Sequence, residues 1–257
     1  MDITRFSPNH RLDPYIREYI IIESDTDLSN SMIPDTSMAM AIRFKGSTAF
    51  TTAAGIDMLP SGVISGLRNE ARTVRYSKGT GNLIVVFKEG GVAAFCAQPA
   101  HELFNQSIAA DNIFTAPSIR DLTEKISEAP SHTIRIKQLE RFLESSLQDA
   151  PADLLITQAV EVMQKQKGII RVKELAASLY ISQDPFEKKF RARIGCSPKK
   201  FAAIIRIRNL INNFSTYGSL TEATYEAGFY DQSHFIKEFR QFTGKSPREF
   251  FAAPQIW

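Results

Sequence analysis

The feature that most constrains this chain is an internal repeat in its C-terminal part. At an offset of 49 residues, a set of Phe, Gly and Ser-Pro positions occurs twice, since Phe186, Phe190, Gly195, Ser197, Pro198 and Phe201 recur as Phe235, Phe239, Gly244, Ser246, Pro247 and Phe250. Lys188 and Arg191 recur as Lys237 and Arg240. Upstream of these positions the offset is 48 residues. The change of one residue in the offset falls in a turn, where an inserted residue costs the least stability. The matches predict two copies of one structural unit.

Each unit reads as a short helix, a tight turn and a second helix. In the second copy Gly228 supplies the positive φ that a sharp turn between helices needs. In the first copy Tyr180 stands at the glycine position, so the turn has to tolerate a bulky side chain. Ser182 and Asp231 are placed as N-caps of the second helices. The pattern predicts helix-turn-helix units at about 171–193 and 220–242.

The second helix of each unit has an aromatic face and a polar face. At about 100° per residue, each Phe pair lies on one side of its helix. The opposite faces carry Asp184, Lys188 and Arg191 in the first copy, and Ser233, Lys237 and Arg240 in the second. Buried aromatics beneath repeated cations are typical of a recognition helix in a DNA major groove. The alternative is an amphipathic helix with solvated cations, and two copies with cations in register favour DNA.

The segment between the copies, about 198–217, is predicted to be one linker helix. About twenty residues of helix span roughly 30 Å. This is close to the roughly 34 Å of one DNA turn. A rigid linker of this length would place two recognition helices in successive major grooves, so that one chain reads two half-sites.

Residues 154–252 resemble the DNA-binding domain of AraC/XylS-type transcription regulators. The resemblance rests on RVKELAASLYIS, GCSPKKF and LTEATYEAGFYDQSHFIKEFRQFTGKSPREF. It implies binding to a specific sequence of double-stranded DNA and control of transcription, with RNA polymerase as a partner. The outward positions that carry over are Lys188, Arg191, Gln232, Ser233, His234, Lys237 and Arg240. The start of the first recognition helix adds Gln183, Asp184 and Glu187 as candidate DNA contacts.

The chain departs from the family pattern at two places. Ala223 and Thr224 stand where the family usually has a large aliphatic residue and then Ala. We therefore expect the first helix of the second unit to pack more loosely. Asp184 and Glu187 put acidic groups on the first recognition helix, which predicts readout of cytosine amino groups or a smaller contribution to affinity.

The charge distribution agrees with a division into two domains. Residues 153–257 hold 16 Lys or Arg against 10 Asp or Glu, a net charge of +6, whereas residues 1–152 hold 15 against 18, a net charge of −3. Such an asymmetry indicates a nucleic-acid binder beside an acidic or neutral domain. A solvated basic face would give the same imbalance. The segment 148–153, with Pro151, is the best linker candidate.

The N-terminal half reads as short strands followed by helices, so the fold class is α+β multidomain. Strand-like runs fill residues 15–87, and 118–129 and 131–147 have helical spacing. The stretches at Leu12, Ile33-Pro-Asp, Leu83–Lys88 and Glu102 resemble the cupin-like barrel that precedes such DNA-binding domains. We expect a sensor or dimerisation domain over 1–149 and the DNA-binding domain over 153–257.

Two features of the N-terminal half have open interpretations. Asp35, Arg43 and Arg75 would bind an acidic ligand at a barrel mouth, or they are exposed strand ends. The 131–147 helix would pair with its counterpart in a homodimer, or it packs back on its own barrel. The ligand, if there is one, would bias how the DNA-binding domains are presented.

Composition limits the other functions. Cys96 and Cys196 form no CxxC pair, which fits a reducing cytosol and argues against a zinc or redox site. The histidines His10, His101 and His132 are widely spaced, so we expect no metal and no cofactor. No signal peptide or membrane span is predicted, and we expect a cytoplasmic protein that is not an enzyme. The rival functions are a constitutive or architectural DNA binder and a cupin-type enzyme.

Overall fold

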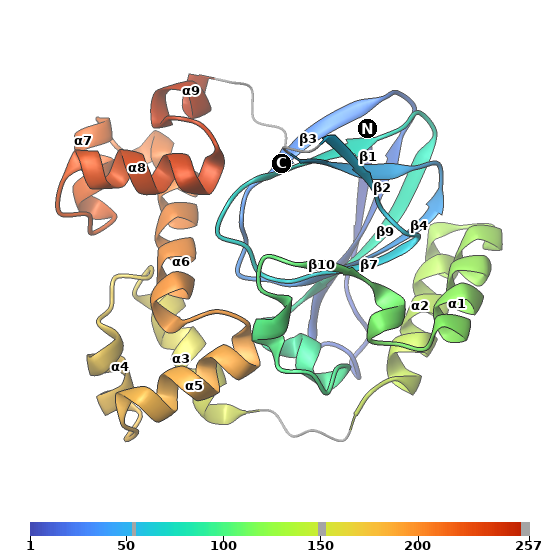
Figure 1. The fold of residues 1–257 in the computed structure, drawn as a ribbon, viewed down its shortest axis with the longest axis horizontal. Helices are drawn as coiled ribbons and strands as arrows, with labels where there is room; N and C mark the ends of the chain where they lie inside the picture. Colours follow the sequence, from blue (N-terminus) through green and yellow to red (C-terminus); the bar gives the residue numbers. More distant parts are fainter. Residues whose placement is uncertain (53–54, 149–152, 253–257) are drawn as a thin grey trace.

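The structure, a computed structural model, describes residues 1–52, 55–148 and 153–252 (Figure 1). Its N-terminal part holds two antiparallel sheets. One sheet is ordered β1 (Asp2–Phe6), β2 (Ile16–Ser24), β9 (Thr80–Phe87), β4 (Ala39–Lys45), β7 (Gly62–Ser65) and β10 (Ser107–Ala109). The other is ordered β3 (Leu28–Met32), β8 (Arg72–Tyr76), β5 (Thr48–Thr52) and β6 (Gly55–Met58). The predicted fold class is confirmed, with strands divided between two sheets and no closed hydrogen-bonded barrel in the described part.

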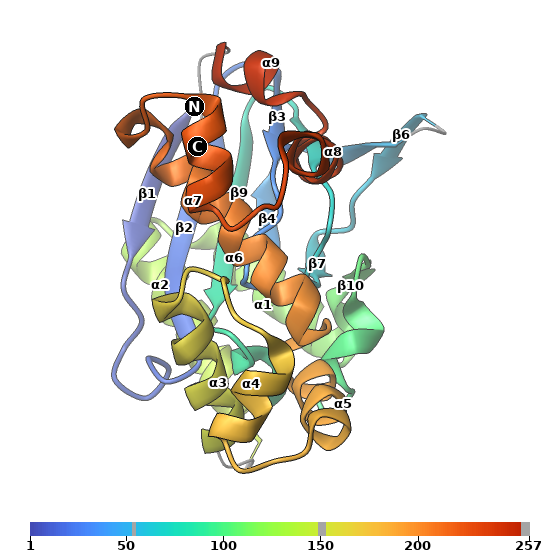
Figure 2. The same ribbon diagram turned by 90° about the vertical axis from the view of Figure 1, so that its left-hand side faces the viewer.

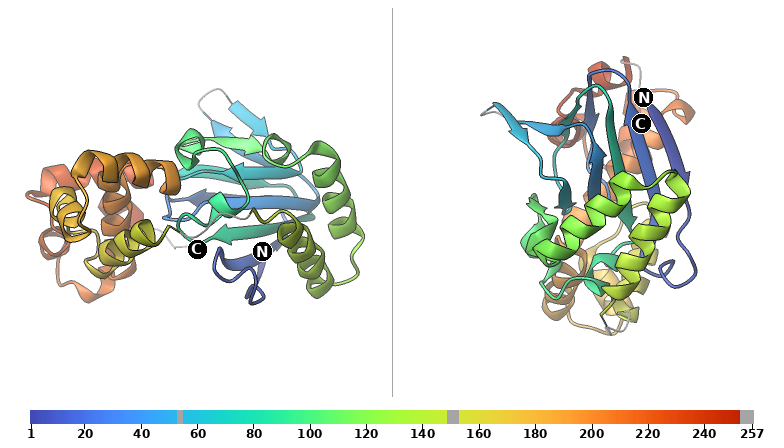
Figure 3. Two further views of the ribbon diagram at one scale, coloured as in Figure 1. Left: turned by 90° about the horizontal axis from the view of Figure 1, so that it is seen from below. Right: turned by 90° about the vertical axis from the view of Figure 1, so that its right-hand side faces the viewer.

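The two faces of the larger sheet have different surroundings. Alternate side chains such as Tyr19, Leu83 and Met40 are fully buried in a cluster with residues of α1 (Ala116–Glu128) and α2 (His132–Ser145). Both helices lie against the outside of this sheet (Figure 3). The opposite face is directed toward the smaller sheet. This is shown by Asn82 of β9, whose side chain donates to the hydroxyl of Thr48 on β5 at 3.2 Å. Period-two alternation therefore divides the sheet into a helix-covered face and an inner face.

The helix predicted over 131–147 corresponds to α2. Ser131 caps it by accepting a hydrogen bond from the Ile134 N–H. Its apolar residues Ile136, Leu139 and Leu143 are buried in the core of their own domain. The structure therefore shows the helix packed back on its own domain, and a homodimer through it stays a prediction.

Short 3-10 turns flank the last strand: η1 (Gly91–Ala94) and η2 (Ala100–Leu103) lie between β9 and β10, and η3 (Ala110–Asn112) follows β10. They complete the apolar end of the N-terminal part, where Val92, Ala94 and Leu103 are buried. The predicted linker overlaps 149–152, which lie outside the described residues. The division at 149 and 153 stays a prediction.

The C-terminal part is helical throughout its described length. It contains α3 (Leu154–Lys165), α4 (Val172–Ser178), α5 (Gln183–Ile194), α6 (Pro198–Asn212), η4 (Phe214–Thr216), α7 (Leu220–Glu226), α8 (Gln232–Thr243) and α9 (Pro247–Ala252) (Figure 2). The linker helix is shorter than predicted, since α6 ends at Asn212 and a 3-10 turn follows. Its fifteen residues span about 22 Å. Asn213 causes this end in part, because its side-chain amide donates back to the Asn209 carbonyl at 2.8 Å.

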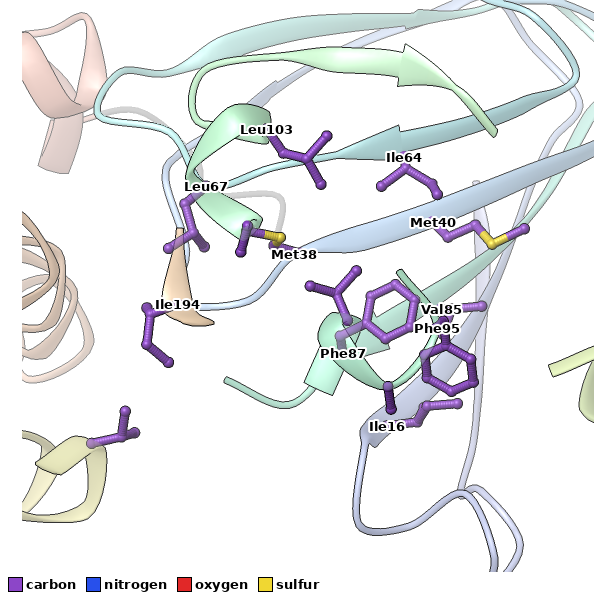
Figure 4. Packing of buried hydrophobic residues seen from close by; sticks show 14 of the residues in the cluster. Ile16, Met38, Met40, Ile64, Leu67, Val85, Phe87, Phe95, Leu103 and Ile194 are labelled. Carbon is purple, nitrogen blue, oxygen red and sulfur yellow. The ribbon is translucent and has the colours of Figure 1, made fainter. Parts of the chain in front are cut away.

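One hydrophobic core is shared by the N-terminal part and the first helix-turn-helix unit. Phe186, Phe190 and Ile194 of α5 belong to the same buried cluster as Met38 and Leu103 of the N-terminal part. Figure 4 labels Ile194, Met38 and Leu103 of this cluster. The second unit has a core of its own around Phe235 and Phe239. The first unit is thus packed onto the sheets, whereas the second is joined to them mainly through α6. Within the described ranges, no helix has the length and apolar composition needed to cross a bilayer.

Candidate nucleic-acid interface

The turn between the two helices has the same geometry in both units. Gly228 has φ 72°, and Tyr180 at the equivalent position has φ 55°. In each unit the next residue donates its N–H back to the first helix, from Phe229 to Thr224 O at 3.2 Å and from Ile181 to Ala176 O at 3.1 Å. This is a Schellman helix ending. The Tyr180 side chain is 99% exposed, which is how an aromatic residue is accommodated at a position that favours glycine.

The helices after the turns begin differently. Asp231 caps α8, because its carboxylate accepts a hydrogen bond from the His234 N–H at 2.7 Å. Ser182 holds the N-cap position of α5, but its side chain makes no capping hydrogen bond. The start of α8 is therefore fixed by a charged cap, and that of α5 by its tertiary packing.

Aromatic pairs anchor both second helices. Phe186 and Phe190 are fully buried with ring centroids 5.6 Å apart, and Phe235 and Phe239 are fully buried at 5.4 Å. A third ring completes each set, since Phe190 meets Phe201 at 5.5 Å and Phe239 meets Phe250 at 5.3 Å. The repeat in the sequence is thus a repeat of one packing unit.

The outer face of α8 is polar, cationic and open to solvent. Gln232, Ser233, His234, Lys237 and Arg240 are all exposed. Ser233, Lys237 and Arg240 line a shallow hollow together with Ile236 and Gln241. Within the described ranges, the side chains of Lys237 and Arg240 form no ion pair and no hydrogen bond. Two cations one helical turn apart are therefore available to phosphates or base edges.

The outer face of α5 is bordered by the N-terminal part. Gln183, Asp184, Lys188 and Arg191 are exposed and Glu187 is half-buried. Asp184, Glu187, Lys188 and Arg191 line a hollow with His101 of η2, and α5 packs against η2. Gln183 donates to Glu187 at 2.8 Å, so part of the acidic character is engaged within the helix. The placement of His101 could not be found from sequence spacing, because it depends on domain packing.

Residues 175–253 match a protein family described as a helix-turn-helix domain. Residues 4–109 match another family, described as a domain of unknown function (DUF6597). The chain carries an AraC-type helix-turn-helix domain. The resemblance of the C-terminal part to AraC/XylS-type regulators is thereby confirmed.

A curated relative with a similar sequence is the Msm operon regulatory protein of Streptococcus mutans. It is 24% identical over 155 residues, which is 58% of this chain and 55% of that protein. The chain thus matches about half the length of this relative.

Two solved structures are also similar to the chain. One is ToxT from Vibrio cholerae with a bound unsaturated fatty acid, which is 12% identical, with 98% of this chain and 100% of that chain covered and a TM-score of 0.47. The other is a regulator from Chromobacterium violaceum described by its AraC-type DNA-binding domain. It is 22% identical, with 38% of this chain and 90% of that chain covered and a TM-score of 0.36.

The structure places the two residues of α7 that depart from the family pattern, Ala223 and Thr224, inside the domain. Ala223 and Thr224 are both buried, at 0% and 1% exposure. The Thr224 hydroxyl donates to the Leu220 carbonyl at 2.7 Å, so its polar atom is satisfied. That α7 packs more loosely stays a prediction, because burial alone does not measure how closely these two small side chains are packed.

The three residues predicted to meet an acidic ligand are not brought together. Asp35 forms an ion pair with Arg208 of α6 at 3.4 Å. Arg43 donates to the Leu59 carbonyl at 2.9 Å. Arg75 is exposed on the outward side of β8 and lines a separate hollow with Asp27 and Tyr76. A ligand role for these residues stays a prediction, and Asp35 links the N-terminal part to the AraC-type domain.

The described residues include no group of three His, Cys, Asp or Glu side chains close enough to hold a metal ion. Both cysteines are buried and unpaired. Burial raises the pKa of the Cys196 thiol to about 12, although nearby Lys200 acts in the opposite direction. The neutral thiol is a poor nucleophile and metal ligand, so Cys196 acts as a packing residue.

Proposed function

We propose that this protein is a transcription regulator that binds a specific sequence of double-stranded DNA through α5 and α8. The observation that carries the proposal is the solvent-facing pair Lys237 and Arg240 on α8, above the buried rings of Phe235 and Phe239. Lys188 and Arg191 repeat this arrangement on α5. The rigid aromatic base fixes the helix, and the free cations supply contacts to phosphates and guanine edges.

The N-terminal part would control how the two recognition helices are presented. Its core is continuous with that of the first unit, and Asp35 pairs with Arg208 of α6. A small molecule or partner bound there would act on DNA binding through these contacts. RNA polymerase as a partner, a homodimer and a cytoplasmic location belong to the same proposal. The relative whose name describes an operon regulatory protein supports it.

The second candidate is a constitutive or architectural DNA binder. The observation that favours it is the burial of the first unit against the sheets, which would fix a single arrangement. It predicts DNA affinity that does not change with any small molecule. Both candidates require recognition helices that contact DNA, so the contact is tested first.

The test selects genomic fragments bound by the purified full-length protein at about physiological salt, where non-specific binding is weak. We expect a shared motif with two half-sites. Fragments carrying it are then titrated with the Lys237→Ala, Arg240→Ala double variant. We expect the double variant to lose at least ~2 kcal/mol of binding free energy, which corresponds to a DNA affinity reduced about 30-fold or more. The slope of log affinity against log salt should fall by about 2 if both contacts are to phosphates.

The matched control is Lys137→Ala, Arg141→Ala on α2. It removes the same charge from exposed positions on the far side of the molecule (Figure 1). We expect affinity within about twofold of the parent protein. Equal weakening by both double variants would mean that net charge, rather than the α8 face, binds DNA. Recovery of fragments without a common motif would favour the architectural candidate.

A further inference from the structure

Two arginine side chains converge on one hydroxyl group at the inner side of the sheets. Arg68 precedes β8 and donates from Nη2 to Ser107 Oγ at 3.1 Å. Arg72, on β8, donates from Nη1 to the same oxygen at 2.8 Å. Ser65 on β7 lies 2.7 Å from Ser107, hydroxyl to hydroxyl. The four side chains come from three strands and a loop, so the cluster is a product of the tertiary fold.

Neither guanidinium has an acidic partner in contact. Among the residues that the structure describes, no carboxylate forms an ion pair with Arg68 or Arg72, and Asp57 and Glu70 act only at longer range. Burial and the neighbouring charge of Arg72 lower the pKa of Arg68 to about 10. The Arg72 guanidinium also stacks on Phe50, 3.7 Å from the ring centroid. Two like charges held close together in half-buried positions, with no carboxylate in contact, are an unfavourable arrangement.

The donors of this cluster are largely unused. Each arginine carries five N–H donors in a fixed fork. Among the described residues, each guanidinium donates one hydrogen bond, to Ser107 in both cases. Both side chains are half-buried, so the remaining donors stay within reach of a small molecule. The geometry suits an anion with several oxygens, which forked donors bind best.

The surface beside the cluster is apolar and incompletely covered. The strand register places Ser107 next to Ser65, Ser65 next to Ala39 and Ala39 next to Val86. The adjacent row joins Ile20, Ile84 and Ala41. Of these, Ala39, Ala41, Ile20, Ile84 and Val86 are only half-buried, whereas the residues between them on the helix-covered face are fully buried. The inner face thus offers apolar contact adjoining the paired charges.

We propose that Arg68, Arg72 and Ser107 bind the anionic head of a small organic anion, a carboxylate or a phosphate ester. Its apolar body lies along the inner face at Ala39, Ile84 and Val86. The bound anion would place a counter-charge in direct contact with both guanidinium groups, and its body would cover the half-buried row. This site is distinct from the exposed position of Arg75.

The site is connected to the second helix-turn-helix unit. Asn69, next to Arg68, lines a hollow with Ile204 and Ile207 of α6 and Glu238 and Gln241 of α8. A ligand that shifts the Arg68 guanidinium therefore acts on a loop that borders the same hollow as the second recognition helix. This consequence rests on the proposed function, whereas the anion site itself does not.

The test measures thermal unfolding of the full-length protein with hexanoate, hexyl phosphate and hexanol at constant ionic strength. We expect at least one of the two anions to raise Tm, by about 3–6 °C at ten times its Kd, and hexanol to have no such effect. The anion with the lower Kd identifies the head group. Arg68→Met and Arg72→Met should each weaken the binding of that anion about 10- to 100-fold.

A matched control is Arg120→Met, which removes the same charge from an exposed position on α1 and should leave the Kd unchanged. Without ligand, Arg68→Met should raise Tm, because it removes a repulsive, half-buried charge, whereas loss of a structural arginine would lower it. The proposal is overturned if neither anion raises Tm, if hexanol raises Tm equally, or if Arg68→Met and Arg72→Met weaken binding no more than Arg120→Met does.

Failure of this proposal and of the proposed function are distinguishable. Anion binding that depends on Arg68 but leaves affinity for the selected DNA unchanged supports the site and removes its regulatory role. Unchanged DNA affinity in the Lys237→Ala, Arg240→Ala variant contradicts the DNA contact through α8 and leaves the anion result standing.

Discussion

The internal repeat provides a matched pair of substitutions that measures how the first unit is held. Gly195 and Gly244 end α5 and α8 at equivalent positions, with φ 106° and 75°. Each donates its N–H four residues back, to Arg191 O at 3.0 Å and to Arg240 O at 2.8 Å. A Cβ atom added at Gly244 has no neighbour within 4 Å. A Cβ at Gly195 overlaps the Met38 methyl group and lies 3.2 Å from the Ala100 carbonyl oxygen.

The two alanine variants therefore separate backbone strain from packing. The left-handed conformation costs a residue with a Cβ about 1–2 kcal/mol, and this applies to both sites. Overpacking of a buried contact adds typically about 1–3 kcal/mol. Met38 is buried at 4% exposure, so its methyl group has to move within a filled core. We expect Gly244→Ala to cost about 1–2 kcal/mol and Gly195→Ala about 2–5 kcal/mol.

Urea unfolding of the full-length variants, followed by far-UV circular dichroism, measures the difference. The difference between the two sites should be at least ~1 kcal/mol, seen as a lower midpoint for Gly195→Ala. Equal midpoints would mean that the Met38 methyl group moves aside at no cost and would refute the expected overpacking at Gly195. Gly195→Ala should also expose the α5–η2 contact to proteolysis, whereas Gly244→Ala should leave that cleavage rate unchanged.

Two further predictions concern caps and pH. Asp231→Ala should destabilise the protein by about 1 kcal/mol, because it removes the cap that holds the His234 N–H, whereas Ser182→Ala should cost only a few tenths; equal losses in urea midpoint would contradict the assigned difference between the caps. The free energy of unfolding should fall as pH rises above about 9, because the Cys196 thiol ionises in the unfolded chain with its ordinary pKa of 9.0 but stays neutral in the fold up to about pH 12. Burial likewise raises the pKa of Tyr76 to about 12, and each such group contributes up to about 1.4 kcal/mol per pH unit. A urea midpoint that is unchanged between about pH 8.5 and 10.5 would contradict this.

The sequence by itself determined the helical units of the C-terminal part. Their signals are local: Phe186 and Phe190 lie one turn apart, and Gly228 or Tyr180 ends a helix within a few residues. Helix periodicity and turn chemistry act over about ten residues, so they can be recognised in the sequence. The same locality made the outward direction of Lys237 and Arg240 predictable. The end of α6 was missed because side-chain bonds from Asn213 compete with the apolar pattern.

Only the tertiary structure decided what the N-terminal part brings together. The pairing of Arg68 and Arg72 at Ser107 depends on strand register between segments about 35 residues apart, which no local pattern encodes. The same holds for Asp35, which meets Arg208 across the two parts of the chain, and for His101 beside α5. The apolar pattern of α2 predicted a buried face but not its partner. Hydrophobic burial is non-directional, so a helix pattern shows that a face is covered, and the packed fold decides by what.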